Sequence, residues 1–302
     1  MKMLNILKSR PLVAVAVLTA ALSIQAGASV IDIGTAAGYS VLVYNSSNNS
    51  DMAAQGAPIG VVNGNWTQSG GQQTNTQQTT TVYLSPGFTL NGPPSETAVY
   101  DGPKLAASWA AAQTASSNFA ALAPTQVIGA VTGNMTISEA AVGNYVFSIS
   151  SISLNHTSLT LSAPKGSTYV LNISGDVTIN GAGGSGILLA GGLTTNDVVY
   201  NFTGGGSLVT SGGMNSSGGG GGSLVQGIVL NPNGTVALHP GEVQGEVIAK
   251  NFSSSSATQI SVPPSVPEAS TLLPLAGVLG MAVVMPMLRR KRALALETVE
   301  TV

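Results

Sequence analysis

The sequence contains no cysteine, and only 7% of its 302 residues are charged. The missing cysteines exclude disulfides and thiolate metal sites, so the fold must be stabilised by burial and backbone pairing, which a large domain can provide. Between residues 29 and 265 there is no arginine, and three lysines stand against nine acidic residues, which gives a net charge of −6. This segment lacks the basic footprint of a nucleic-acid-binding protein, and we expect no nucleic-acid partner.

Groups for catalysis and cofactor binding are also scarce. The two histidines, His156 and His239, each lie beside an expected turn, and we expect both to be solvated. The His-Glu-x-x-His zinc motif, the Gly-x-Ser-x-Gly elbow and the Walker loop are all absent. We therefore expect no catalytic residue, no cofactor and no metal site, and the protein is predicted not to be an enzyme.

The acidic residues leave two minor alternatives open. Glu242 and Glu246 are the nearest pair in sequence, but they flank a turn, and we expect them on solvated faces rather than converging on one sugar bond. A polysaccharide-cleaving β-helix enzyme would also cluster Asp with Arg or Lys, and this segment has no Arg. Asp176 and Asp197 lie near glycine-rich turns, where Ca²⁺ is often bound, but the Gly-Gly-x-Gly-x-Asp repeat is missing.

The N-terminus carries an export pattern. Three basic residues within the first ten precede an apolar stretch from residue 11 to 22, and Ala26-Gly27-Ala28 forms a small-residue cleavage site. This pattern is typical of a secretory signal peptide. Residues 1–28 are therefore predicted to be removed, and the mature chain is predicted to begin at Ser29.

The C-terminal segment, residues 263–302, combines three features in a fixed order. The polar motif Val266-Pro267-Glu268-Ala269-Ser270-Thr271 precedes an apolar run from residue 272 to 288, and the basic cluster Arg289-Arg290-Lys291-Arg292 follows it. A run of about 17 residues lies at the lower limit for a membrane-spanning helix. The four cations behind it would remain on the cytoplasmic side.

This segment resembles the PEP-CTERM sorting signal of Gram-negative bacteria that use exosortase, with Ala269 where the family commonly has a second proline. The resemblance implies an exosortase-type membrane enzyme as a partner and transient attachment to the inner membrane. It also implies later release to the cell surface or the medium. A plain single-span anchor is the alternative interpretation.

Between the two targeting segments the sequence predicts many short strands. Apolar runs of four to six residues are separated by Gly, Asn and Ser, and several alternate with period two, as Tyr145, Phe147 and Ile149 do. The polar stretch from Thr67 to Thr81 is predicted to be an exposed loop. The Gly/Ser-rich stretch from Gly204 to Ser223 is predicted to be a mobile loop.

One segment, residues 104–122, predicts a helix. Prolines stand just before it and just after it, and apolar residues recur at three-to-four spacing, which is the pattern of a helix with one buried face. We expect this face to pack against a sheet. Its members are Leu105, Trp109, Ala112, Ser116, Phe119 and Ala123.

A short internal repeat in the sequence indicates how the strands are organised. Val225-Gln226-Gly227-Ile228-Val229 returns 18 positions later as Val243-Gln244-Gly245-Glu246-Val247. A repeat of about 20 residues is typical of one coil of a β-solenoid. The prediction is a mainly β solenoid at residues 29–262, with early strands and loops at 29–102, a helix within 103–124 and solenoid coils at 125–262.

The same region resembles the choice-of-anchor A family, a collagen-binding-type surface domain. The resemblance rests on the segment 227–233, on Gly241 to Lys250, and on Tyr169-Val170-Leu171-Asn172-Ile173-Ser174-Gly175, which is similar to the central strand of the family. It implies a surface-displayed domain that is compatible with different C-terminal anchors.

These features together predict a non-enzymatic cell-surface or biofilm-matrix protein that contacts exopolysaccharide or other surfaces through a polar solenoid face. An adhesin or an ice-binding module is the alternative. Thr157, Thr160, Thr194 and Thr195 are the residues that suggest ice binding, although their positions do not recur at a constant offset.

Overall fold

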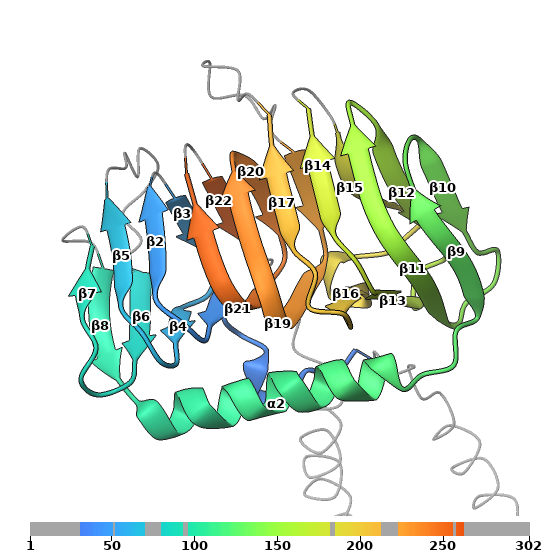
Figure 1. Ribbon diagram of the computed structural model, residues 1–302. Coiled ribbons are helices and arrows are strands. Elements are labelled where there is room, and N and C mark those ends of the chain that lie inside the picture. Colours follow the sequence, from blue (N-terminus) through green and yellow to red (C-terminus); the bar gives the residue numbers. More distant parts are fainter. Residues whose placement is uncertain are drawn as a thin grey trace, which may run out of the picture. The chain divides into compact units, whose positions relative to one another are not determined.

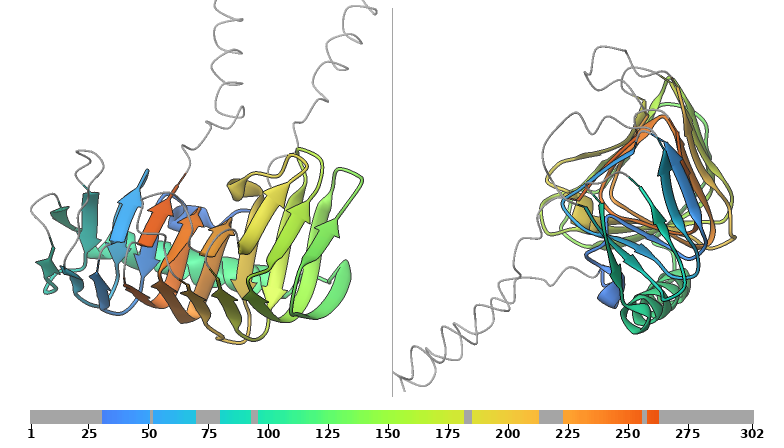
Figure 2. Two further views of the ribbon diagram at one scale, coloured as in Figure 1. Left: turned by 90° about the horizontal axis from the view of Figure 1, so that it is seen from above. Right: turned by 90° about the vertical axis from the view of Figure 1, so that its left-hand side faces the viewer.

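The computed structural model describes residues 31–50, 52–69, 80–92, 96–181, 185–212, 223–255 and 258–262. These residues form a β-solenoid with a roughly triangular cross-section and one long helix along one side (Figures 1 and 2). Every strand pair among them is parallel. The predicted mainly β solenoid with a single flanking helix is confirmed.

The solenoid has three faces, which we call the front, back and helix faces. The front face, toward the viewer in Figure 1, ends at strands β9 and β7. Strands β11, β19 and β21 bend at a corner, so their C-terminal parts belong to the front face and their N-terminal parts to the helix face. The front strands are β9 (Gln126–Val131), β11 (Asn144–Asn155), β14 (Val177–Asn180), β17 (Leu208–Ser211), β19 (Ile228–His239), β21 (Val247–Ser254), β2 (Ser47–Ser50), β5 (Trp66–Ser69) and β7 (Leu90–Asn91).

The other two faces continue the same coils. The back face is a separate seven-stranded sheet with β10 and β3 at its edges. Its strands are β10 (Met135–Ser138), β12 (Ser158–Ser162), β15 (Gly186–Ala190), β18 (Ser223–Gln226), β20 (Gly241–Gln244), β22 (Thr258–Ser261) and β3 (Met52–Gln55). The helix face adds β13 (Thr168–Ile173), β16 (Val198–Phe202), β1 (Val41–Val43), β4 (Ile59–Val61), β6 (Thr80–Leu84) and β8 (Glu96–Tyr100).

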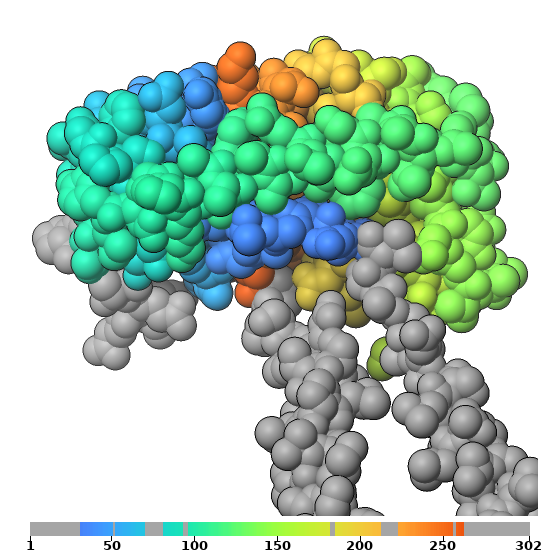
Figure 3. Space-filling model, turned by 90° about the horizontal axis from the view of Figure 1, so that it is seen from below, coloured from blue at the N-terminus to red at the C-terminus, as the bar shows by residue number. Residues whose placement is uncertain are grey.

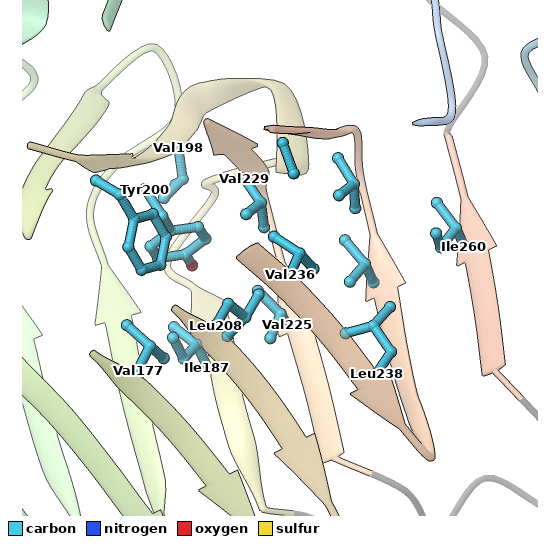
Figure 4. Close-up of a cluster of buried hydrophobic side chains, with 14 of the residues drawn as sticks. Val177, Ile187, Val198, Tyr200, Leu208, Val225, Val229, Val236, Leu238 and Ile260 are labelled. Atoms are coloured by element: carbon cyan, nitrogen blue, oxygen red, sulfur yellow. The ribbon is translucent and has the colours of Figure 1, made fainter. Parts of the chain in front are cut away.

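The core fills the space between the three faces. Alternate residues of each strand point inward, and equivalent positions on successive coils stack in rows. Val225 and Val243 form one such row and are 18 positions apart, so the sequence repeat corresponds to one coil. Figure 4 shows part of this core, with Val177, Leu208, Val236 and Leu238 packed between the sheets.

The order of the coils differs from the order of the sequence. The chain begins beside the last C-terminal coil, because β1 pairs with β21 and β3 pairs with β22. From there β4, β6 and β8 extend the stack in one direction. Helix α2 then carries the chain back to the opposite end, where β9 pairs with β11 and the remaining coils begin.

Helix α2 (Gly102–Ala120) begins directly after β8, where the Asp101 side chain accepts a hydrogen bond from the Lys104 N–H (3.1 Å). At a rise of 1.5 Å per residue its 19 residues span about 29 Å, which equals about six strand spacings of 4.8 Å. Its contacts reach from β13 to β6, which are six strand spacings apart on the helix face. The helix therefore crosses most of the stack.

A second core lies between α2 and the helix face. Leu105, Trp109, Ala112 and Phe119 pack against outward residues of the strands and against the segment that precedes β1. The space-filling view shows this segment in blue beside the helix (Figure 3), where it contains the 3₁₀ turn η1 (Gly34–Ala36). The predicted apolar stripe is thus confirmed, except that Ala123 lies beyond the end of the helix and is exposed.

Asparagine side chains bind the C-terminal half of the helix to the sheet. Asn172 and Asn201 are neighbours in register on β13 and β16. Asn201 Nδ2 donates to the Ser116 carbonyl (3.0 Å) and to Asn172 Oδ1 (2.8 Å), and Asn172 Nδ2 donates to the Phe119 carbonyl (2.7 Å). The Ser116 hydroxyl donates to Asn201 Oδ1 at 2.6 Å. These bonds fix the last turns of the helix to β13 and β16.

Two loop predictions were partly wrong. Strand β5 includes Thr67 and β6 begins at Thr80, so the polar stretch between them starts and ends within the solenoid. Strand β17 lies inside the predicted mobile loop from Gly204 to Ser223. Its four residues join the sheet because Leu208 points into the core and pairs with Val177 and Val236.

Candidate binding faces

The front face presents two rows of outward side chains. The first row has one residue from each front strand except β9, and the second ends at β5. The first row contains Ser153, Thr178, Val209, Ala237, Ser253, Asn48, Thr67 and Asn91. The second row contains Asn155, Asn180, Ser211, His239, Ser255, Ser50 and Ser69. None of these residues is acidic, lysine or arginine. Together they form an uncharged polar surface that is repeated at each coil.

His239 is part of this surface and not of a catalytic group. It lies at the end of β19, where it is half-buried, and its Nδ1 is 2.6 Å from the Ser255 hydroxyl. His156, the other predicted turn histidine, is exposed and has a φ of 55°. The histidine of the turn is therefore solvated as expected, whereas the histidine of the strand joins a row.

Buried polar groups support the front face near the N-terminal coils. Asn49 Nδ2 donates to the Ser47 hydroxyl (3.0 Å), and the Ser254 hydroxyl donates to Asn49 Oδ1 (3.2 Å). Gln68 Nε2 donates to the Met52 carbonyl (2.9 Å), which joins the front and back faces. Buried polar groups that are satisfied in this way hold the strands in one register.

The back face has longer and less uniform outward side chains. Its central row contains Thr136, Thr160, Leu188, Gln226, Gln244, Ser261 and Gln55. Leu224 and Glu242 stand in the adjacent row, on neighbouring strands. The back face therefore lacks the uniform short side chains of the front face.

An amide ladder runs across the centre of the back face. Gln226 Oε1 accepts from the Leu189 N–H (2.8 Å), Gln226 Nε2 donates to Gln244 Oε1 (2.7 Å), and Gln244 Nε2 donates to Glu242 Oε1 (2.7 Å). The main-chain donor at one end and the carboxylate at the other set the direction of both amides. The 18-residue repeat in the sequence already places both glutamines at the same position of a coil, and this signal could have predicted that they are neighbours.

The acid pair of the sequence does not converge. Glu242 is half-buried on the outward side of β20. Glu246 lies in the corner after β20 and is only 8% exposed, so its predicted solvated position was wrong. Its Oε1 accepts a hydrogen bond from the Gly38 N–H (3.0 Å), while Oε2 has no partner. Burial raises the pKa of Glu246 to about 7, and the Gly38 hydrogen bond opposes this effect in part.

A second buried carboxyl group lies at the far end of the N-terminal coils. Glu96 on β8 points inward, and its Oε2 has no partner. Burial raises the pKa of Glu96 to about 7 as well. Both groups lie where N-terminal coils stack, and neither faces the rows described above.

The two aspartates near glycine-rich turns have structural partners. Asp176 Oδ1 accepts from the Ser207 N–H (2.7 Å) and hydroxyl (2.9 Å), and the N–H bond is the main cause that lowers the pKa of Asp176. Asp197 Oδ2 accepts from the N–H and hydroxyl of Thr194, which closes the 3₁₀ turn η2 (Thr195–Asp197). Within the described ranges, no group of three or more His, Asp or Glu side chains is placed to hold a metal ion.

The threonines that suggested ice binding do not share one surface. Thr160 points outward from the back face. Thr157 precedes β12 and its hydroxyl is buried without a partner, and Thr194 and Thr195 belong to the η2 turn. The uncharged rows of the front face consist instead of other residues.

The targeting segments lie outside the described residues. This applies to the cleavage site at Ala26 and Ala28, the motif from Val266 to Thr271, the apolar run and the basic cluster at 289–292. In the part of the chain that is described, no helix has the length and apolar character that a membrane span requires.

Several solved structures of ice-binding proteins have the same fold. An ice-binding protein from an Antarctic biological consortium is 19% identical, with a TM-score of 0.53, and the match covers 77% of this chain and 91% of that one. The ice-binding protein of the Antarctic ascomycete Antarctomyces psychrotrophicus is 17% identical, with a TM-score of 0.51 and coverage of 78% and 99%. LeIBP, an antifreeze ice-binding protein from an Arctic yeast, is 19% identical, with a TM-score of 0.51 and coverage of 79% and 96%. At such identities these matches show the fold alone.

The family model extends over most of the chain. No curated protein matches the sequence. The model described as "Putative Ice-binding-like adhesive domain" matches residues 16–260, which include every described strand except the last residue of β22. The chain therefore belongs to the ice-binding-like adhesive domain family.

Proposed function

We propose that this protein is an exported, non-enzymatic adhesive module that binds extended hydrated surfaces through its front face. The observation that carries the proposal is the pair of uncharged, mostly polar rows on eight parallel strands. Neighbouring strands place their outward side chains, most of which carry a hydroxyl or carboxamide group, at intervals of about 4.8 Å. A face that repeats in this way is better suited to an extended, repetitive surface than to a single small molecule. Many weak contacts add up when they form together.

A neutral, hydroxyl-rich exopolysaccharide fits the chemistry of this face. Hydroxyl and carboxamide groups can both donate and accept hydrogen bonds, as the hydroxyls of a sugar do. The rows contain no acid, lysine or arginine, so binding should depend little on ionic strength. Protein surfaces such as collagen, which the choice-of-anchor A resemblance implies, are a further possible target of an adhesin.

Ice is the second candidate ligand, and one observation favours it. Most side chains in the first front row are short, and Thr178, Val209 and Ala237 follow one another on adjacent strands. A smooth row that combines methyl and hydroxyl groups is suited to a flat solid surface. The name of the family and the titles of the structural relatives support the same ligand class.

Replacement of one outward residue by lysine distinguishes the front face from the back face. Thr178 is exposed on β14, the third front strand from the β9 end, and Thr160 points outward from β12 on the back face. Residues 29–262, with and without each change, would be sedimented with insoluble exopolysaccharide and tested for thermal hysteresis. Thr178→Lys should weaken binding about tenfold or more, because the long side chain holds the face away from a flat ligand and desolvates a charge. Thr160→Lys should leave binding unchanged.

The outcome for each ligand is decided separately. Exopolysaccharide binding that is lost in Thr178→Lys supports adhesion, and thermal hysteresis that is lost in the same variant supports ice binding. Equal effects of both variants, or no binding to either ligand, would refute a front-face adhesive function.

The targeting segments support a proposed route to the surface. The signal peptide would direct export, and the PEP-CTERM-like segment would hold the protein in the inner membrane until an exosortase-type enzyme processes it. The intact mass of the native protein from inner-membrane, outer-surface and medium fractions tests this route. A product that begins at Ser29 and ends near Pro267, found outside the inner membrane, is the expected result. A product in the inner membrane that retains Arg289 to Arg292 would indicate a simple anchor instead.

A further inference from the structure

The large apolar side chains that the described residues expose are confined to the two ends of the stack. At one end, Val99 and Tyr100 lie on β8, the last strand of the helix face. At the other end lie Leu122, Val127, Met135 and Val142, which belong to β9, β10 and the turns beside them. Figure 1 shows β8 and the β9/β10 pair at opposite ends of the solenoid.

Two of these side chains continue rows of the core. Tyr100 is paired with Leu84, and Met135 is paired with Leu159. Leu84 and Leu159 are completely buried, whereas Tyr100 is 57% exposed and Met135 is 36% exposed. Each end therefore presents core positions that one more coil would cover. Solenoid proteins ordinarily close such ends with a polar cap.

The terminal strands also lack the usual protection of free edges. Natural edge strands are commonly interrupted by Lys, by Pro or by an inward-pointing charge. Strands β8, β9 and β10 contain no Lys, Arg or Pro. Their one inward-pointing acid is Glu96 on β8, and burial raises its pKa to about 7, so it protects the β8 edge less at lower pH. The pairing of β9 with β11 has a register shift at Gly129, at the corner between two faces. Strand β19, which is not an edge strand, has a similar register shift at its own corner, so such a shift accompanies the bend of a strand.

The fold defines which partner fits these edges. Every described strand pair is parallel, so a simple translation along the solenoid axis brings β9 of one copy parallel to β8 of another. The new ladder would continue the interface by which the coils already stack within one chain. We propose that copies of this domain associate head to tail, with the β8 end of one copy against the β9/β10 end of the next. Such a contact joins two different surfaces and can extend to open chains of several copies.

Lysine substitutions at the two ends test the proposal. The two core clusters consist entirely of residues between 31 and 262, so the segment 29–263 is a compact unit that can be studied alone. Tyr100→Lys blocks the β8 end, and Val127→Lys blocks the other end, where Val127 is 71% exposed. Thr178→Lys adds the same charge on β14, a front strand that is paired on both sides, and serves as the matched control. Thermal unfolding would confirm that all three variants remain folded.

Sedimentation velocity over a range of concentrations provides the readout. The wild type and Thr178→Lys should form dimers and larger species as the concentration rises. Each end variant alone should remain monomeric, because a buried, unpaired ammonium group weakens the contact by about a hundredfold or more. An equimolar mixture of the two end variants retains one free end of each kind and should form dimers but no larger species.

Three results would overturn the proposal. A wild type that stays monomeric up to its solubility limit would mean that something other than a second copy covers the ends. An end variant that still dimerises alone would show contact between identical ends. A mixture of end variants that stays monomeric would show that the two ends do not recognise each other.

Discussion

The buried carboxyl of Glu246 should make the stability of the domain depend on pH. Its pKa is raised from 4.5 to about 7 by burial. A carboxyl whose pKa is higher in the folded state than in the unfolded chain stabilises the fold fully below the unfolded pKa. This stability is then lost as the pH rises toward the folded pKa. The loss for this shift is about 3 kcal/mol, reached above pH 7.

The substitution Glu246→Gln isolates this effect. Glutamine has nearly the same shape, can still accept the Gly38 hydrogen bond, and remains neutral at every pH. The variant should lie within about 1 kcal/mol of the wild type at pH 5 and exceed its free energy of unfolding at pH 8 by up to about 3 kcal/mol. For a domain of this size the gain corresponds to a rise in Tm of about 6–12 °C. Urea unfolding of residues 29–262 at both pH values measures the difference.

The matched control is Glu242→Gln, which removes the same charge from a half-buried position four residues earlier. It should change stability by less than about 1 kcal/mol at either pH, because the side chain lies at the surface. Glu96, whose pKa is also raised to about 7, retains its own pH dependence of the same sign in both variants, so it cancels when the variants are compared with the wild type. If Glu246→Gln shifts stability by the same amount at pH 5 and pH 8, the carboxyl is not the titrating group and the argument fails.

Three further substitutions test the packing. Phe119→Ala removes a buried side chain between α2 and the sheet and should cost about 3–5 kcal/mol of unfolding free energy in urea. Asn201→Ala removes the acceptor of the buried Ser116 hydroxyl and the side-chain donor to Asn172 Oδ1, and should cost about 1–3 kcal/mol in the same assay. Gly245→Ala places a Cβ against the Gly227 carbonyl at a φ of +147°, so it should destabilise the domain, measured as a lower Tm.

The helix and the coil repeat could be predicted from the sequence because both are local patterns. The stripe from Leu105 to Phe119 follows the helical period between two prolines, and its members pack as expected. The repeat around Gln226 and Gln244 has the length of one coil, and the structure pairs these two residues directly. Neither prediction required knowledge of which distant segments meet.

The position of the N-terminal coils could not be predicted in the same way. Strand β1 has only three residues, and its partner β21 lies more than 200 positions later. Short apolar strands in parallel ladders are interchangeable in sequence pattern, so nothing local identifies the partner. The burial of Glu246 depends on the same junction, because Gly38 reaches it from the N-terminal side. A glutamate beside a glycine turn is ordinarily exposed, and only the stacking of the two coils covers this one.

The front-face rows were missed for a related reason. The coils differ in length, so residues of one row, such as Thr178 and Val209, do not recur at a constant offset. The threonines that stood out in the sequence belong to turns and to the back face. Register, and not composition, determines which side chains share a surface.

The location of β22 determines how the domain bears mechanical load. This last described strand lies between β20 and β3, and Val262 after it donates its N–H to the Gln55 carbonyl. If the chain is held through its C-terminal tail, tension enters at the strand next to the β3 edge of the back face, and this strand is paired on both sides. A pull along β22 loads the hydrogen bonds to both neighbours at the same time, so they must break together and not one after another. An adhesive domain attached in this way resists shear at its anchor point while both of its ends and its front face stay free for contact.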